Sequence, residues 1–594
     1  MEKRVIFLLI VLAFHQIANG QFISPKHYDN FPVQQLNEDL DPFQEHFALI
    51  EESEVLNRAI NTFPPKEAVR SMAEWEEIEA ITITWADYFE TLSNIVRHAQ
   101  HECKVYINCV SAEKVKSDLE LYSVDYNENV IFLENQNFNT VWIRDYGPNS
   151  AYLNDVDSLI FVDWVYNREQ RPEDDILPEA FSEQIDVQLY QTSEGKFQLT
   201  ATGGNFMSDG LGNGFSSRLV VDENQSLHED EIDNIMHQFL GITNYIKFDK
   251  LDFDGIHHID MHMKLLDEER FIFGEYPEGE GDHDIIEANI EHLLATELNA
   301  FGEPYEIIRV PMPPDNDKTY PSISGEADFR TYTNALFINK TILVPTYQEL
   351  YDSTALRIWR ETMPGYNIVG IRCNEMISAF GAIHCVTKEI GVLDPLRIVF
   401  QKIKDQEEPK YDGYTLTAKV QHRSGIASAK LFYRKKGTLE YDQLTMTLVD
   451  ANEDLYSATI PDFIDRGSVE YFVKGEANSG KVINRPQPAP AGYYSFDVNN
   501  SVTSTTSLEN VFDRLAFPNP SSGIVCIPVD FNESVKGDLG LFDVHGKLIQ
   551  SIFSGKFEAG NSKHFINVSE IPSGLYALRL TNNKGVFTQK LVVE

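Results

Sequence analysis

The segment AFGAIHCVT (379–387) contains the residue with the most distinctive chemistry, Cys385. Small residues ahead of it can form a turn that exposes its sulfur in a pocket, and the thiolate is the nucleophilic form of cysteine. A nearby imidazolium or a cationic substrate would lower the pKa of the thiol and favour that form. Considered alone, the segment fits a buried, unreactive cysteine better than a nucleophile.

A second segment, GIHHIDMH (255–262), could transfer protons. If it is extended, His258, Asp260 and His262 project from the same face. A histidine beside a carboxylate can act as a general acid and base. The same triplet would suit zinc or another divalent cation, and a structural role is the third alternative. His384 is adjacent to Cys385 and would point the other way in an extended segment, so His258 is the better candidate partner for the thiol.

A third segment, WIRDYGP (142–148), places an aspartate after a predicted strand, where it can lie at the rim of a pocket. A guanidinium is a planar cation, best held by a carboxylate that accepts two parallel hydrogen bonds. Asp145 could do this while Trp142 stacks on the cation. The alternative is a packed turn with an internal pair between Arg144 and Asp145.

These segments lie in a region, about residues 70–404, where short apolar runs alternate with amphipathic helices, which indicates an α/β domain. We expect strands in ITITW (81–85), KVYINCV (104–110) and VIFLE (130–134). One predicted helix carries apolar residues at helical spacing: Phe89, Leu92, Ile95, Val96 and Ala99. A second begins with Ser226 and Glu229 as a capping box and ends at Gly241.

The rest of the chain divides into further predicted parts. The basic start and short apolar run of residues 1–20 predict a secretory signal peptide, followed by an N-terminal extension at 21–69. Downstream, β-rich runs at 405–498 predict an immunoglobulin-like sandwich. A polar linker (499–511) leads to a last β-rich module (512–594). No other segment approaches the length of a membrane span.

Composition limits the possible partners. The chain has 594 residues, with 92 acidic against 49 basic ones, a formal net charge of −43. This argues against nucleic acid, because phosphate binding needs a basic surface, and it would attract cationic peptides. The five cysteines are too few for a disulfide scaffold, and their odd number leaves at least one thiol unpaired.

Taken together, the three chemical segments resemble the agmatine deiminase superfamily of guanidine-modifying enzymes, and within it the bacterial peptidylarginine deiminases. AEWEEIEAITITW (73–85), ATGGNFMSDG (201–210) and GAIHCVTK (381–388) also match. The resemblance implies a pentein fold, a pseudo-fivefold α/β propeller around a central pocket, and no metal or cofactor. It also implies that Cys103 and Cys109 are structural and can pair.

The resemblance also assigns roles to residues. Cys385 attacks the guanidinium carbon and forms a thiouronium intermediate, and His258 protonates the departing ammonia and then activates water. Asp145 and Asp260 hold the guanidinium nitrogens, Trp142 lines the pocket and Asn334 helps to position the substrate.

The segment YNREQRP (166–172) bears on the choice of guanidine. It resembles the segment with which secreted relatives clamp the carboxylate of a terminal arginine. Arg168 matches the first arginine of that clamp directly, Arg171 matches the second after an insertion, and Glu169 is expected to neutralise part of its charge. A solvated loop with charges at i and i+3 is the alternative.

The C-terminal module resembles the sorting domain of the type IX secretion system through FPNPSSG (517–523), DVHGK (543–547) and SGLYALRL (573–580). We therefore expect a protein that is secreted or attached to the cell surface, with the type IX machinery and arginine-containing peptides or proteins as partners. The competing hypotheses are an agmatine deiminase, a surface-anchored binding protein with an inactive core, and a metal-dependent hydrolase.

Overall fold

The computed structural model describes residues 61–498 and 516–593, except 167, 323–326, 408, 411, 462–466, 532–533, 544–546 and 583–584. The predicted signal peptide (1–20), most of the extension (21–69) and the linker (499–511) lie outside the described residues. The chain divides into two compact units, Met1–Val498 and Asn499–Glu594.

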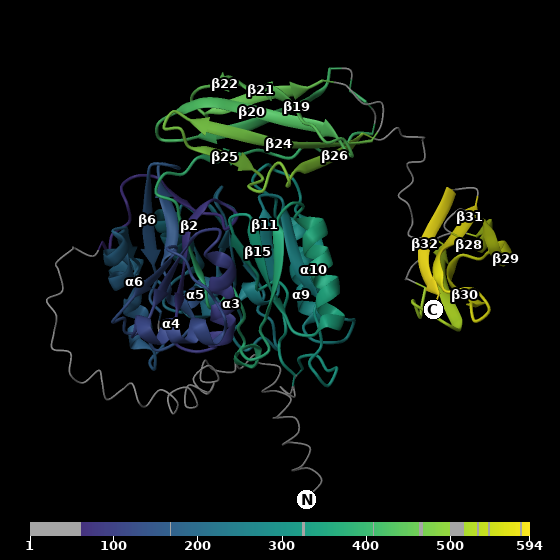
Figure 1. Ribbon diagram of the computed structural model, residues 1–594, viewed down its shortest axis with the longest axis horizontal. Coiled ribbons are helices and arrows are strands. Elements are labelled where there is room, and N and C mark those ends of the chain that lie inside the picture. The colour runs from purple at the N-terminus through teal and green to yellow at the C-terminus, as the bar shows by residue number, and fades with distance from the viewer. Residues whose placement is uncertain are drawn as a thin grey trace, which may run out of the picture. The chain divides into compact units, whose positions relative to one another are not determined.

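The first unit contains a repeated arrangement of three strands and a helix. In one copy, β5 (Asn149–Leu153) pairs antiparallel with β6 (Ser158–Asp163), and α6 (Pro172–Ile185) leads to β7 (Gln188–Gln191), which pairs parallel with β6. The short β1 (Val69–Ser71) is added beside β5. Figure 1 shows α6 and α10 on the outside of the strands.

Within the described residues, four further copies follow the same order of an antiparallel pair, a helix and a parallel strand. They are β8 (Met207–Ser208), β9 (Asn213–Ser217), α8 (Glu229–Leu240) and β10 (Asn244–Phe248); β11 (Met263–Asp267), β12 (Arg270–Glu275), α9 (His283–Thr296) and β13 (Glu306–Pro311); β14 (Leu336–Ile338), β15 (Thr341–Thr346), α10 (Glu349–Thr362) and β16 (Asn367–Arg372); and β17 (Lys388–Gly391), β2 (Ile78–Thr84), α3 (Phe89–Ala99) and β3 (Lys104–Asn108), extended by α4 (Ala112–Leu121) and β4 (Val130–Leu133).

Contacts between neighbouring copies close them into a ring. β17 contacts β5, α8 contacts β1, α10 contacts β13 and α3 contacts β16. The remaining junction is formed by Phe215 on β9 and Phe271 on β12, whose ring centroids lie 5.0 Å apart. One sheet of the ring combines β2 to β4 from its beginning with β17 from its end.

The ring brings five connecting segments together. Each precedes the first strand of a copy: α5 (Ile143–Tyr146) before β5, the 3-10 turn Gly203–Asn205 before β8, the 3-10 turn Ile259–Met261 before β11, residues 333–334 before β14 and residues 384–385 before β17. Because equivalent ends of the five copies face the same centre, residues from distant parts of the sequence meet there.

The predicted elements are found, with one change. Strands occupy most of 81–85, 104–110 and 130–134, and the apolar stripe of α3 packs inward. Gly241 ends α8 at φ 69° as expected. The predicted start of α8 at Ser226 was wrong: Leu227 N donates to Asn224 O in a preceding turn, and the helix begins after His228, whose N–H donates to the Glu231 carboxylate at 2.8 Å.

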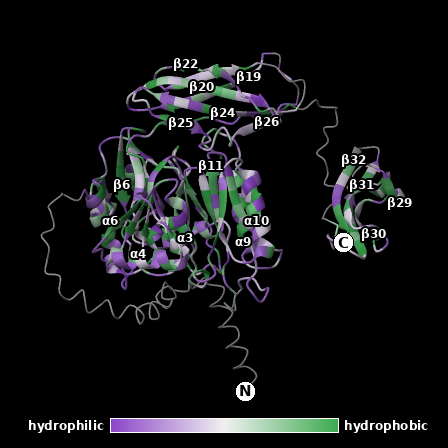
Figure 2. Cartoon of the chain, in the orientation of Figure 1, coloured by the Kyte–Doolittle hydropathy of each residue, from purple (hydrophilic) through white to green (hydrophobic). Residues whose placement is uncertain are grey.

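Burial follows the hydropathy of the elements. Figure 2 shows β6 and β11 as largely hydrophobic and α4 as largely hydrophilic on its visible face. All five residues of β11 are buried, including Lys264. A buried lysine within such a strand needs an anionic partner, because an unpaired buried charge is costly.

A β-sandwich follows in the same unit. One sheet contains β18 (Arg397–Val399), β19 (Tyr414–Gln421), β23 (Leu455–Ile460) and β22 (Thr447–Asp450). The other contains β21 (Asp442–Thr445), β20 (Ile426–Lys435), β24 (Gly467–Ala477), β25 (Val482–Arg485) and β26 (Tyr494–Val498). Strand β18 belongs to this sandwich although it lies upstream of residue 405. The sandwich has its own apolar core.

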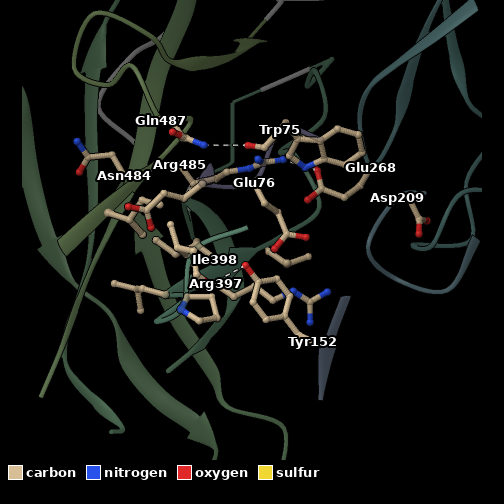
Figure 3. Close-up of a pocket in the computed structure, with 16 residues that line it drawn as sticks. Trp75, Glu76, Tyr152, Asp209, Glu268, Arg397, Ile398, Asn484, Arg485 and Gln487 are labelled. Atoms are coloured by element: carbon tan, nitrogen blue, oxygen red, sulfur yellow. Dashed lines mark hydrogen bonds and ion pairs between the residues drawn. The ribbon is translucent and has the colours of Figure 1, made fainter. Parts of the chain in front are cut away.

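The sandwich packs against the ring at a polar junction. Gln487 Nε2 donates to Trp75 O at 3.0 Å, and Arg485 Nη2 lies 2.7 Å from Glu268 Oε2. Figure 3 shows these residues around a pocket, with Glu76 and Arg397 beside them. The loop that carries Trp75 is therefore tied to the sandwich through Gln487.

The C-terminal unit is a second β-sandwich. One sheet is formed by β27 (Ile524–Phe531) and β30 (Gly560–Asn567), and the other by β29 (Leu548–Phe557), β28 (Val535–Asp543), β31 (Gly574–Asn582) and β32 (Gly585–Val593). In neither unit does the described part of the chain include a helix long and apolar enough to cross a membrane.

Candidate active site

Cys385 lies at the centre of the ring and is held by Asn334. The Nδ2 of Asn334 donates to the Sγ of Cys385 at 3.2 Å. The Oδ1 of the same amide accepts from His384 N at 2.9 Å, which fixes the backbone beside the thiol. Cys385 is only 2% exposed, so a substrate has to insert a narrow group to reach it.

The surroundings of Cys385 disfavour its thiolate. Burial is the largest cause that raises the pKa of Cys385 well above its ordinary value, and the charges of Asp260 and Asp145 raise it further. The hydrogen bond from Asn334 acts in the opposite direction. The thiol is therefore neutral at physiological pH until a positive charge enters the site.

His258 and Asp145 form a second pair at this centre. The Nδ1 of His258 lies 3.6 Å from the Oδ1 of Asp145, and its Nε2 lies 3.0 Å from the Oγ1 of Thr202. Burial lowers the pKa of His258, although the charges of Asp145 and Asp260 oppose this shift. Burial also raises the pKa of Asp145, against the charges of His258 and Arg171. His258 is thus a neutral base beside a carboxylate.

Gly204 allows the His258–Asp145 pair to sit close to the backbone. A Cβ atom at this position would lie 2.5 Å from His258 Nδ1 and 3.3 Å from Asp145 Oδ1. The first distance is shorter than any ordinary van der Waals contact, so a side chain here would displace the imidazole. Thr202 and Gly204 were given no role in the sequence analysis, although the Gly-Gly pair in ATGGNF is typical of a close backbone approach.

Asp260 lies on the other side of the thiol, with its Oδ2 3.8 Å from Cys385 Sγ. The same Oδ2 lies 2.7 Å from the Nδ1 of His384. Burial acts to raise the pKa of Asp260, but the hydrogen bond and charge of His384 outweigh burial and keep it below its ordinary value. Asp260 is therefore an anion.

The predicted geometry of the histidine segment was wrong. Residues Ile259–Met261 form a 3-10 turn, so His258, Asp260 and His262 do not share one extended face. His262 packs beside Phe273 instead, with ring centroids 6.4 Å apart. The structure also turns His384 toward Asp260, where the sequence suggested that it would point away from the site. These positions do not match the metal-binding triplet, and no cluster of three potential ligand side chains occurs among the described residues.

Two carboxylate oxygens at the centre lack a hydrogen-bond partner, although Asp145 Oδ1 lies 3.6 Å from His258 Nδ1. Asp145 Oδ1 and Asp260 Oδ1 are buried and have no hydrogen-bond partner among the described residues. Buried acceptors without donors are costly, so these atoms mark where a ligand with N–H groups would be stabilised. A planar cation that donates in two directions meets this requirement.

Trp142 forms one wall near the centre. It is buried, and a Cβ atom on Gly381 would lie 2.2 Å from its ring. The alternative internal pair between Arg144 and Asp145 does not form. Arg144 Nη2 instead lies 2.6 Å from Glu389 Oε2, and its Nε donates to His384 O at 3.1 Å. The Asp145 carboxylate is left available to a ligand.

The two arginines of the predicted clamp are held near Asp145, whose pKa their charges lower. Arg168 Nη2 lies 2.8 Å from Glu223 Oε1, and Arg171 Nη1 donates to the hydroxyl of Tyr166 at 2.7 Å. Neither side chain is a solvated loop residue. Glu169 is exposed, and the carboxylate that pairs with Arg168 is that of Glu223, 55 positions after Arg168.

The pair that the resemblance allowed between Cys103 and Cys109 does not form, because both are free thiols. They flank β3 at its opposite ends, six residues apart. A strand rises by about 3.3 Å per residue, so their Cα atoms are separated by roughly 20 Å, whereas a disulfide allows about 7 Å.

Two parts of the chain are similar to known proteins. A family model described as "Porphyromonas-type peptidyl-arginine deiminase" matches residues 70–390, and one described as "Secretion system C-terminal sorting domain" matches residues 515–594. A relative from Vibrio parahaemolyticus, named "Putative agmatine deiminase", is 22% identical over 365 residues, covering 56% of this chain and 99% of the relative.

Solved structures also match this part of the chain. One described by the same name as the Vibrio relative has a TM-score of 0.51 at 20% identity, covering 57% of this chain and all of its own. The agmatine deiminase of Enterococcus faecalis has a TM-score of 0.49 at 18% identity and covers 56% of this chain and 99% of its own. The expected pentein fold of the ring is thereby confirmed.

Proposed function

Because the chain belongs to the Porphyromonas-type peptidyl-arginine deiminase family, we propose that it hydrolyses the guanidinium of peptidyl arginine to citrulline and ammonia, with Cys385 as the nucleophile. The observation that carries this proposal is the pair of unpartnered carboxylate oxygens on Asp145 and Asp260 beside the thiol. Two anions and one sulfur at the centre of the ring suit a flat cation that is attacked at its central carbon.

Binding of the substrate is also the step that activates the nucleophile. The guanidinium donates to Asp145 and Asp260, and its positive charge offsets the two negative charges that keep the pKa of Cys385 high. The thiol proton can then pass to His258, which is neutral in the empty site because burial lowers its pKa. Thiolate and imidazolium thus form only with the substrate bound.

The chemistry then proceeds through a covalent intermediate. The sulfur of Cys385 forms a bond to the guanidinium carbon, and His258 returns its proton to one terminal nitrogen, which leaves as ammonia. His258 next takes a proton from water, whose oxygen attacks the thiouronium carbon. Cleavage of the carbon–sulfur bond releases citrulline, and His258 returns the proton to the sulfur to regenerate the thiol. The positive charge of the guanidinium leaves with ammonia as ammonium. One water is consumed for each ammonia released.

The charge near the rim favours a peptide over agmatine. Agmatine carries a second cation, which the charges of Arg168 and Arg171 beside Asp145 would repel. A C-terminal arginine carries a carboxylate, which two arginines can bind. Agmatine remains the second candidate because relatives over the same region are named as agmatine deiminases. An inactive binding protein would have no need for Cys385, His258 and both carboxylates.

The C-terminal unit indicates secretion or attachment to the cell surface. Together with the predicted signal peptide, it supports export by a type IX system, whose machinery is the proposed partner of this unit. An exported enzyme would meet peptides and proteins outside the cell.

The decisive experiment compares substrates with the full chain. The purified protein is incubated with agmatine, free arginine, and peptides with internal or C-terminal arginine, while ammonia and citrulline are measured. Release of both from a peptide, and their loss in Cys385→Ala, is expected. A strong preference for agmatine would make agmatine, and not peptidyl arginine, the substrate. Activity near the wild-type level in Cys385→Ala would overturn the mechanism.

A further inference from the structure

We propose that Glu74 is a positioning residue that, through His384, keeps Asp260 ionised and oriented for the substrate. This inference rests on the proposed function of Asp260. Glu74 contacts neither Cys385 nor Asp145, and its role is derived from the side chains that connect it to the centre.

A continuous chain of polar contacts runs from the reaction centre into the ring. His384 Nδ1 lies 2.7 Å from Asp260 Oδ2, and His384 Nε2 lies 3.1 Å from Glu74 Oε2. The same Oε2 accepts from Lys264 Nζ at 2.5 Å. Asp260, His384 and Lys264 are at most 1% exposed, so these contacts are shielded from water.

The hydrogen-bond acceptors in this series of contacts determine how many protons it holds. An ionised carboxylate only accepts hydrogen bonds, and a neutral imidazole has one N–H group. His384 lies between two carboxylates, so both contacts are satisfied only when both ring nitrogens carry protons. Glu74 thus supplies the second acceptor that keeps His384 an imidazolium, and this cation lies directly against Asp260.

Glu74 is itself held firmly as an anion. Burial acts to raise its pKa, but the charges of Lys264 and His384 keep that pKa well below its ordinary value. Its Oε1 accepts from Phe337 N at 3.2 Å, so both oxygens are fixed. Its neighbour Trp75 is anchored through its carbonyl by Gln487 of the sandwich, as Figure 3 shows.

The orientation of Asp260 follows from the same contacts. His384 binds Oδ2 and leaves Oδ1, the buried oxygen without a partner, for the guanidinium. The imidazolium also offsets part of the negative charge beside Cys385. The charged groups in contact with His384 are Asp260, Glu74 and Arg144, whose Nε donates to the His384 carbonyl, and Lys264 pairs with Glu74.

The test replaces Glu74 and compares a matched neighbour. Glu74→Gln removes the anion and is expected to lower kcat/KM for a peptidyl arginine by about 10- to 100-fold, the usual effect of losing a residue that orients a reacting group. The pH profile of kcat/KM should also differ from that of the wild type, because His384 loses its second acceptor. Glu76→Gln breaks the neighbouring pair of Glu76 and Arg70 and should leave the pH profile unchanged.

A double variant separates positioning from stability. Glu74→Gln leaves Lys264 buried without its anion, so the variant can be destabilised for that reason alone. In Glu74→Gln/Lys264→Met this cost is removed, and the thermal melting temperature should recover while the altered pH profile persists. If the pH profile returns to that of the wild type with the melting temperature, Glu74 is only structural and the proposal fails.

A readout that needs no turnover distinguishes this inference from the proposed function. Histidine labelled with ¹³C at Cε1 reports ring protonation, and the His384 signal is identified by its loss in His384→Gln. The test is run near physiological pH, at about 7.5. We expect the imidazolium signal of His384 in the wild type and its loss in Glu74→Gln. A neutral His384 in the wild type would overturn the inference, whereas absent turnover with every guanidine would overturn only the proposed function.

Discussion

The Oδ2 of Asp260 lies 3.8 Å from the Sγ of Cys385, so the proposed nucleophile has an anion as its neighbour. Asp145 adds a second negative charge, and both raise the pKa of the thiol. A site built to keep a thiolate ready would place a cation there. The geometry instead suits a thiol that becomes reactive when a cationic substrate arrives, which protects a free cysteine from oxidation outside the cell.

Replacing Asp145 should therefore have opposite effects on reactivity and turnover. In Asp145→Asn the pKa of Cys385 falls, because a negative charge is removed, and iodoacetamide should alkylate Cys385 faster at pH near 7 than in the wild type. Deimination should fall by about 10²- to 10³-fold, because the guanidinium loses an ionic acceptor. Mass spectrometry of the Cys385 peptide measures alkylation, with Cys385→Ala as background. Unchanged alkylation would show that Asp145 does not control the thiol.

The absence of a side chain at Gly204 should be essential for activity. Gly204→Ala places a methyl group 2.5 Å from His258 Nδ1, so the imidazole has to move. Displacement by about 1 Å commonly reduces turnover by about 10²-fold. Circular dichroism and thermal melting should show a folded protein. Gly523→Ala is the control, because no atom lies within 4 Å of its Cβ position. Near-normal kcat in Gly204→Ala would contradict the assignment of His258.

The preference for a terminal carboxylate should depend on Glu223. Glu223→Gln releases Arg168 from its ion pair and should raise kcat/KM for peptides ending in arginine, relative to their C-terminal amides, by about tenfold. Arg168→Gln should lower the same ratio. Glu169→Gln alters an exposed carboxylate and should leave it unchanged. Equal ratios in all four proteins, wild type included, would remove Arg168 from substrate recognition.

Lys388 should make stability depend on pH. Burial is the largest cause that lowers its pKa from 10.5 to about 7, with the charge of Arg144 second. Between pH 7 and about 10.5 the unfolded chain binds more protons at this residue than the fold does, so its contribution to stability rises with pH. Lys388→Met lacks this contribution, and all other titrating groups are the same in the two proteins.

The difference between the two proteins is the quantity to measure. Urea unfolding at pH 6 and pH 9 should show Lys388→Met gaining more stability over the wild type at pH 6, by on the order of 2 kcal/mol. The loss of the contact from Lys388 Nζ to Asn149 Oδ1 changes the stability at both pH values, so it cancels when the two stability differences are compared. A difference that is independent of pH would show that Lys388 does not change its charge in this range.

Much of the fold could be predicted because hydrophobic periodicity is local. The stripe of α3 and the stop at Gly241 needed only neighbouring residues. The start of α8 could not be predicted in this way, because a preceding turn from Asn224 to Leu227 competes with the cap at Ser226. The family resemblance left open whether Cys103 and Cys109 pair, and the extended strand between them prevents it.

The site was predicted by residue type and could not be predicted by geometry. Cys385, His258, Asp145 and Asp260 were chosen for their chemistry, and the structure brings them to one centre. Their contacts depend on the closure of the ring, which sequence spacing does not reveal. Glu74 and His384 are 310 positions apart, and no local pattern indicates that they touch.

The sheet that combines β2, β3 and β4 with β17 fastens the beginning of the ring to its end. Cys385 lies three residues before β17, so the nucleophile is set in place by the last strand of the ring to be synthesised. A chain that is still emerging, or one cut short before residue 388, has every other member of the site and no working sulfur. If Cys385 is the nucleophile as proposed, we expect such a chain to be unable to modify arginines until this strand is in place.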